Sequence, residues 1–147
     1  MVFPDKFDKR VQYVFWRAFT PMHPLFRELC MPVRRLRGRS KRQNYLLGTI
    51  VEGRTPQQLA THLLSHGYRR HPVAWRDPDE FVSLRLVKNF EWQYHLRVFT
   101  DGEVRGHYEL TPEAYPFRHL KKHHMQARRE EFLAHLSGWI VPHESKS

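Results

Sequence analysis

The sequence predicts an α+β protein: an antiparallel β-meander of three to four strands with helices packed on one face, plus a basic N-terminal extension. Three observations carry this prediction. Residues 92–110 alternate apolar and polar side chains around a glycine turn, as the strands of a half-buried sheet do. Residues 55–67 have the start and stop signals of a helix, and apolar residues recur at helical spacing between 125 and 140. The order helix, strands, helix is typical of two packed layers.

Residues 1–45 differ in composition from the rest of the chain. They contain four of the ten prolines, the only cysteine and the densest positive charge. Within them, residues 8–20 favour a short helix that Asp8 caps and Pro21 ends. We therefore expect a basic, aromatic and Pro-containing extension over 1–45, an α+β domain over 46–141 and a tail over 142–147.

The clearest helix covers residues 55–67. Thr55 and Gln58 form the Thr-x-x-Gln pattern of a capping box. Pro56 suits the first helical position, and Gly67 suits the residue that follows the last turn. The apolar stripe consists of Leu59, Ala60, Leu63 and Leu64.

Two strands are expected between this helix and the hairpin. Residues 68–75 favour an edge strand, because Pro72 cannot donate a hydrogen bond to a central ladder. Residues 81–88 alternate as a second strand, with their apolar side chains on one face and Ser83 and Arg85 on the other. Antiparallel pairing with the strand that begins near residue 92 extends both faces.

Residues 92–110 are predicted to form a hairpin. The three-residue loop 100–102, with Gly102 in the left-handed conformation, is a favoured closure. A two-residue turn would mix apolar and charged side chains on each face, so the alternation argues against it. With the three-residue loop, one face is apolar and the other carries two cross-strand pairs, His95 with His107 and Arg97 with Arg105.

The C-terminal part of the chain favours a helix that lies on the apolar sheet face. Gly138 stands near its expected end. The residues at helical spacing are Met125, Phe132, Leu133, Leu136 and Ile140.

The chain is strongly basic and contains one cysteine. Its 25 Lys and Arg against 15 Asp and Glu give a net charge of +10 and favour polyanionic partners, nucleic acid first. Cys30 alone excludes an intramolecular disulfide and a multi-cysteine zinc site, which fits a reducing compartment. No transmembrane segment or secretory signal is evident. We expect a cytoplasmic protein, or a nuclear one if the source is eukaryotic.

The function that these features favour is binding of nucleic acid, RNA or single strands in particular, or of another phosphorylated ligand. Residues 34–42, RRLRGRSKR, are typical of a phosphate-contacting arm. The register places Phe99 on the polar face, where we expect an exposed ring on which bases stack. The residues predicted to bind are Arg85, Arg97, Phe99 and Arg105 of the sheet, and Arg34, Arg35, Arg37, Arg39, Lys41 and Arg42 of the arm.

Other interpretations stay open. Small sheet-based ribonucleases that need no metal place an acid, a base and an arginine around the scissile phosphate. In such a ribonuclease or phosphodiesterase, His95 and His107 would be the acid and base, and Glu109 would orient them. A third class is an interaction or structural protein of an assembly, which binds a partner or a second copy through residues 1–45. An ordinary solvated sheet face also shows this charged alternation.

No metal or cofactor is predicted. The sequence has no Gly-rich phosphate loop, dinucleotide fingerprint or GxSxG motif. His119 and His123 have a spacing that zinc accepts on a helix, but the residues between them lack the glutamate of an HExxH motif.

Overall fold

The computed structural model describes residues 46–71, 77, 79–89, 91–111, 114–115 and 128–144. It also describes positions 14, 18, 21, 22 and 25, which are helical and exposed. Several expectations lie outside the described residues: the limits of the helix over 8–20, the basic arm over 34–42, most of the strand beyond residue 71, and the pair His119 and His123.

The protein is an α+β protein with a six-stranded antiparallel sheet, in the order β2-β3-β4-β5-β1-β6. The fold class agrees with the prediction, and the sheet has more strands than the predicted three to four. The strands are β1 (Leu46–Ile50), β2 (Arg69–Arg70), β3 (Glu80–Val87), β4 (Trp92–Phe99), β5 (Glu103–Leu110) and β6 (Ile140–Pro142).

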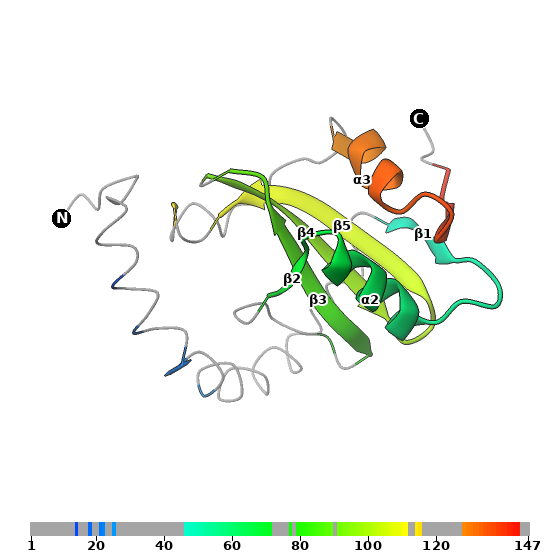
Figure 1. Cartoon of the computed structure of the whole chain (residues 1–147), viewed down its shortest axis with the longest axis horizontal. Helices are drawn as coiled ribbons and strands as arrows, with labels where there is room; N and C mark the ends of the chain where they lie inside the picture. The colour runs from blue at the N-terminus through cyan, green and yellow to red at the C-terminus, as the bar shows by residue number, and fades with distance from the viewer. Residues whose placement is uncertain are drawn as a thin grey trace, which may run out of the picture.

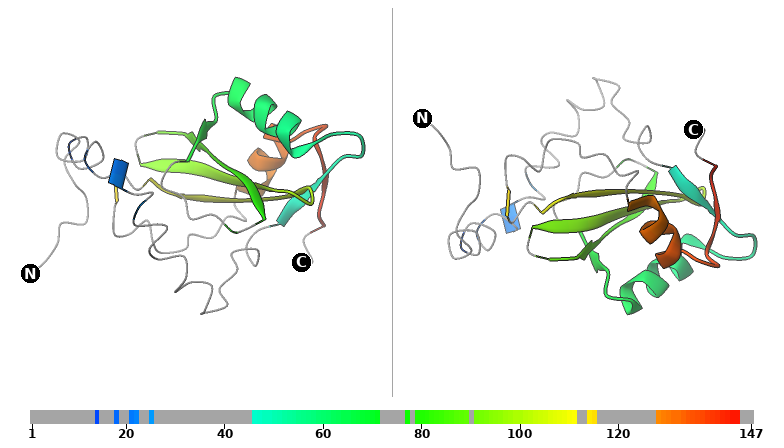
Figure 2. Two further views of the ribbon diagram at one scale, coloured as in Figure 1. Left: turned by 90° about the horizontal axis from the view of Figure 1, so that it is seen from below. Right: turned by 90° about the horizontal axis from the view of Figure 1, so that it is seen from above.

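Two helices, α2 (Pro56–Ser65) and α3 (Arg129–His135), pack on the same face of the sheet. Figure 1 shows α2 in front of the sheet, and the right-hand view of Figure 2 shows both helices on one side of it. No helix among the described residues is long and apolar enough to cross a membrane. The predicted arrangement of helices on one sheet face is confirmed.

The capping signals of α2 are confirmed in full. Gln58 N donates to the Thr55 hydroxyl at 3.2 Å, and Thr55 N donates to the Gln58 side chain at 2.8 Å. Both contacts satisfy amide groups that the first turn of a helix leaves without a partner. Gly67 follows the helix with φ of 88°, which allows the chain to turn back toward β2.

The hairpin of β4 and β5 has the predicted register. Gly102 has φ of 88°, and the pairs include Leu96 with Gly106 and His95 with His107. β3 pairs with β4 so that Leu84 lies opposite Leu96. The predicted division into an apolar and a polar face is therefore confirmed across three strands.

The core lies between the apolar face and the two helices. The ring of Phe132 from α3 meets the Tyr94 ring edge to face at 4.6 Å, and Leu59 and Leu63 of α2 join the same cluster. Gly106 provides the space for this contact. A Cβ at that position would lie 2.9 Å from Phe132 Cε1 and 2.7 Å from a methyl group of Leu96.

The C-terminal helix is shorter than predicted. It ends at His135, Gly138 has φ of 69°, and Ile140 lies in β6 opposite Ile50 of β1. The expectation that the helix continues through Ile140 is wrong. Positions 136 and 140 match helical spacing, but Ile140 is buried by pairing with a strand 90 positions earlier, which local periodicity cannot reveal.

Gly48 allows β6 to approach β1. Gly48 lies opposite Pro142, and a Cβ there would collide with the backbone carbonyl of Val141. We expect Gly48→Ala to lower the free energy of unfolding by about 1–3 kcal/mol, measured by urea denaturation. Thr49→Ala, at the exposed neighbouring position, is the control and should change it by less than about 0.5 kcal/mol. Equal effects of the two substitutions would contradict this account of the β1 and β6 contact.

Candidate functional site

The polar face of the sheet, meaning the face of β3, β4 and β5 opposite the helices, is buried at its centre and half-buried at Arg85, Arg105 and His107. His95 and Arg97 are each 4% exposed, and Ser83 and Gln93 are completely buried. Buried polar groups must be hydrogen-bonded to one another to offset their loss of water. The cross-strand pairs expected from the sequence therefore belong to an internal polar network.

Glu109 of β5 is the centre of this network. Its Oε1 lies 3.2 Å from His95 Nδ1, and its Oε2 lies 2.8 Å from His107 Nε2. Gln93 donates its side-chain amide to Oε1 at 2.9 Å. The two imidazoles also approach each other, with His95 Nδ1 3.2 Å from His107 Nε2. The structure thus brings together the three residues that the sequence marks as candidate catalytic groups.

Glu109 determines the tautomer of His95, and Ser83 contacts the other ring nitrogen. The Ser83 hydroxyl oxygen lies 2.6 Å from His95 Nε2. A carboxylate only accepts hydrogen bonds, so the contact with Glu109 places a proton on Nδ1 of His95. Nε2 then carries a lone pair that accepts from the Ser83 hydroxyl. We therefore assign His95 as the neutral Nδ1–H tautomer.

The protonation states agree with this assignment. Burial lowers the pKa of His95 to about 3, although the hydrogen bond and charge of Glu109 oppose that shift. Burial alone would raise the pKa of Glu109, but the charge and hydrogen bonds of His107 and His95 lower it well below its usual value. An ionised carboxylate is thus held against a neutral imidazole in the interior.

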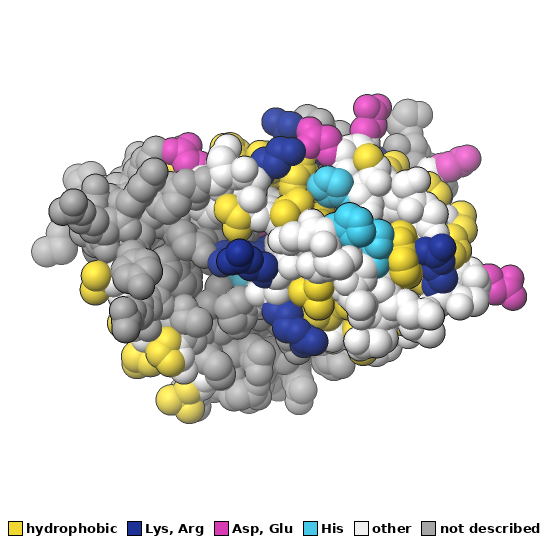
Figure 3. All heavy atoms as spheres, viewed as in Figure 1, with side chains coloured by type: hydrophobic (Ala, Val, Ile, Leu, Met, Phe, Trp, Pro, Cys, Tyr) yellow, Lys and Arg dark blue, Asp and Glu magenta, His cyan; other side chains and the backbone are white. Residues whose placement is uncertain are grey.

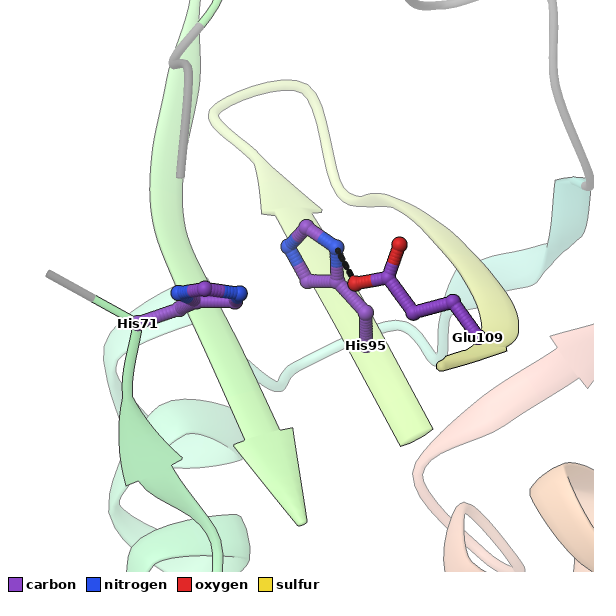
Figure 4. A group of neighbouring side chains, drawn as sticks. All are labelled: His71, His95 and Glu109. Carbon is purple, nitrogen blue, oxygen red and sulfur yellow. Dashed lines mark ion pairs between the residues drawn. The ribbon is translucent and has the colours of Figure 1, made fainter. Parts of the chain in front are cut away.

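His71 joins the network from the residue directly after β2. Its backbone N–H donates to the Ser83 carbonyl at 3.0 Å, and its ring centre lies 4.8 Å from that of His95. Figure 4 shows the His95 imidazole between the His71 ring and the Glu109 carboxylate. Sequence reasoning missed His71. The only signal in the sequence was a polar residue within an expected edge strand. The residues that His71 contacts are determined by the pairing of β2 with β3.

Arg97 is neutralised by acids that sequence reasoning did not assign to this face. Its guanidinium donates to Glu80 at 3.1 Å and lies 3.8 Å from a carboxylate oxygen of Asp77. A β-bulge between Glu80 and Val82 brings Glu80 opposite Phe99, so simple alternation does not place it here. Arg97 is consequently part of a buried ion pair and not an open phosphate ligand.

The other two arginines of the face also contact neighbouring side chains. Arg105 lies 2.9 Å from a carboxylate oxygen of Glu103, and Arg85 donates to Gln93 at 3.3 Å. Both are half-buried, whereas Arg97 is buried. Arg85 contacts a neutral side-chain amide here, whereas Arg97 and Arg105 contact carboxylates.

The expectation that Phe99 is an exposed stacking platform is wrong. Phe99 lies on the polar face as its register requires, but its side chain is 0% exposed. Burying an aromatic ring of this size stabilises the fold by about 2–3 kcal/mol, which favours burial even beside polar groups. A base therefore cannot stack on Phe99 in this structure.

Ser83 contacts His95, and His95 contacts Glu109. This series resembles a nucleophile, its general base and an acid that orients the base. Ser83 is completely buried, so this conformation offers no substrate a route to its hydroxyl. What the buried centre does provide is a group of imidazole nitrogens and carboxylate oxygens suited to holding a proton or a cation.

The fold and this centre define a two-layer α+β protein with a histidine and glutamate cluster under the polar face. No family model, curated protein or solved structure matches the chain.

Arg97 and Arg105 form a matched pair for testing the buried network. Arg97→Met removes the guanidinium beside buried Glu80 and half-buried Asp77, so we expect the free energy of unfolding to fall by about 3–5 kcal/mol. Arg105→Met removes a more exposed pair and should cost less than about 1 kcal/mol. Urea denaturation measures both, and Glu80→Gln should recover part of the loss in the Arg97→Met background. Similar costs for the two arginines would rule out the difference in burial as the cause.

Proposed function

We propose that the protein binds nucleic acid, preferring RNA or single strands, through basic segments outside the described domain, chiefly the arm over residues 34–42. The observation that supports this proposal most is the separation of charge along the chain. The arm itself lies outside the described residues, so the proposal rests on its sequence and on what the described domain lacks.

The described residues are close to charge balance. They include nine Lys and Arg against eleven Asp and Glu, whereas the remaining residues include sixteen against four. The net charge of +10 therefore comes entirely from the remaining residues, and eleven of their basic residues precede residue 46. Because phosphate contacts dominate nucleic-acid affinity, these segments are the stronger candidates for the contact surface.

The exposed cations of the described domain do not gather on the face that carries α2. Figure 3 shows Lys and Arg side chains there in separate small groups, some of them next to Asp and Glu. The clearest additional contribution comes from the edge strand β2, where Arg69 and Arg70 are exposed and Arg69 lies opposite Arg85. Within the described part of the chain, neither Arg69 nor Arg70 forms an ion pair. β2 thus offers a small secondary contact.

The geometry favours binding over catalysis by the histidine pair. General acid and base groups must reach the proton they transfer, directly or through one water. His95 is 4% exposed and both of its ring nitrogens contact Ser83 or Glu109. His107 is the more exposed member, but its Nε2 faces Glu109.

The arm can be tested by neutralising it in the full chain. We expect replacement of its six basic residues by Gln to weaken binding to a labelled single-stranded oligouridylate and to flatten the salt dependence. Each lost phosphate contact lowers the slope of log K against log salt concentration by about 0.7, so the slope should fall by up to about 4. Fluorescence anisotropy over a range of salt concentrations measures both quantities. The residues replaced are Arg34, Arg35, Arg37, Arg39, Lys41 and Arg42.

The control is the triple variant Arg69→Gln, Arg70→Gln and Arg85→Gln, which alters the described domain only. It should lower the slope less than the arm variant does, because it removes fewer and more dispersed charges. An unchanged affinity and slope in the arm variant would overturn the proposal. If inorganic polyphosphate competes with the oligouridylate as well as unlabelled oligouridylate does, the protein binds polyanions in general and the proposal of nucleic-acid binding is wrong.

A further inference from the structure

Three metal-ligating side chains converge under the polar face from three different segments. His71 follows β2, His95 lies in the middle of β4, and Glu109 lies near the end of β5. One ligand atom from each lies within 4.8 Å of the other two, and all three side chains are buried. Figure 4 shows the rings and the carboxylate directed toward one another. We propose that His71, His95 and Glu109 form a binding site for one divalent transition-metal ion of the zinc class.

The donor set fits such an ion. Two imidazoles and one carboxylate are the protein ligands of one known class of zinc site and of the facial triad that binds ferrous iron. Two ligands about 2.0–2.1 Å from a tetrahedral ion are about 3.3 Å apart. His95 Nδ1 and Glu109 Oε1 are 3.2 Å apart, so this pair already has the required separation. The ligand atom of His71 lies within 4.8 Å of those of His95 and Glu109.

The surrounding residues supply the supporting contacts that metal ligands require. A ligating imidazole usually donates its second N–H to an acceptor, which fixes its tautomer. When Nδ1 of His95 binds the ion, the ring proton is carried on Nε2, and this N–H donates a hydrogen bond to the Ser83 hydroxyl oxygen 2.6 Å away. Gln93, which donates to Glu109 Oε1, and His107, which contacts Oε2, orient the carboxylate.

The positive charge of a bound ion is compatible with its surroundings. The Glu109 carboxylate supplies a negative charge to a bound ion, and imidazoles bind metal ions in their neutral form. Arg97, a buried cation of the same face, is compensated by Glu80 and Asp77. The Arg97 guanidinium therefore does not present an uncompensated positive charge to a bound ion. This inference is independent of the nucleic-acid proposal, since it uses none of the residues of the basic arm.

The test is direct metal binding by the full chain. Protein stripped with EDTA and dialysed should bind one Zn²⁺ per chain at this site with a dissociation constant in the micromolar range or below, measured by competition with a chromophoric chelator. Glu109→Gln and His71→Gln should each weaken the binding by at least about 100-fold, because each removes a ligand. Absence of stoichiometric binding in the wild type, or undiminished affinity in these two variants, would overturn the proposal.

Two controls separate this site from other histidines. His143→Gln changes an exposed histidine of the described domain, and His119→Gln with His123→Gln removes the pair at helical spacing. Both controls should retain the affinity of the wild type, and loss of tight binding in either would count against the proposed ligands. Circular dichroism in EDTA checks that each variant folds.

A spectroscopic measurement on the wild-type protein does not depend on the variants. Wild-type protein loaded with Co²⁺ should show the intense visible absorption of a four- or five-coordinate site. A spectrum identical to that of Co²⁺ in buffer would overturn the proposal whatever the variants do.

Discussion

Burial of the polar face is the constraint on which the rest of the structure depends. In β4 every residue from Gln93 to Phe99 is buried, although three of these seven are polar and lie on the face opposite the helices. Taking a carboxylate or a guanidinium out of water costs several kcal/mol unless opposite charges and hydrogen bonds replace the solvent. The face meets this requirement with two acid-centred groups: Glu109 beside two histidines, and Glu80 with Asp77 beside Arg97. Because these charges are already paired within the protein, they are poorly suited to bind a phosphate group from outside.

The turn between β4 and β5 determines which residues of this network lie opposite one another. The left-handed Gly102 closes the hairpin with three residues and places His95 opposite His107. A register shift of one residue would turn the histidines into the apolar core and Tyr94 onto the polar face. The contacts of Glu109 with both histidines would then be lost, while the apolar cluster around Leu96 would open. The two faces therefore reinforce one register, and the buried polar groups contribute to specificity of the fold even where their net contribution to stability is small.

The sequence alone yields the parts of this arrangement that local rules determine. The capping box of Thr55 and Gln58, the hairpin register and the assignment of faces all depend on residues within one element or one turn. The remaining features depend on distant pairing. β1 and β6 are too short to stand out, a bulge brings Glu80 beside Arg97, and His71 meets His95 only because β2 pairs with β3. Burial of the polar face also could not be predicted from the sequence, because the alternation of polar and apolar residues is the same whether the second face meets solvent or the protein interior.

The remaining question is why a sheet should bury histidines where apolar side chains would pack. Replacing buried ionic groups with well-packed apolar ones is often neutral or stabilising, so stability alone does not explain the centre around Glu109. A cluster that serves only the register needs cross-strand contacts between paired residues, such as His95 with His107. His71 adds nothing to that register, since it lies outside the hairpin and reaches the centre from the edge of the sheet. Its convergence with His95 and Glu109 is instead what a bound cation requires, because an ion gains from donors gathered on one point irrespective of the strands that supply them.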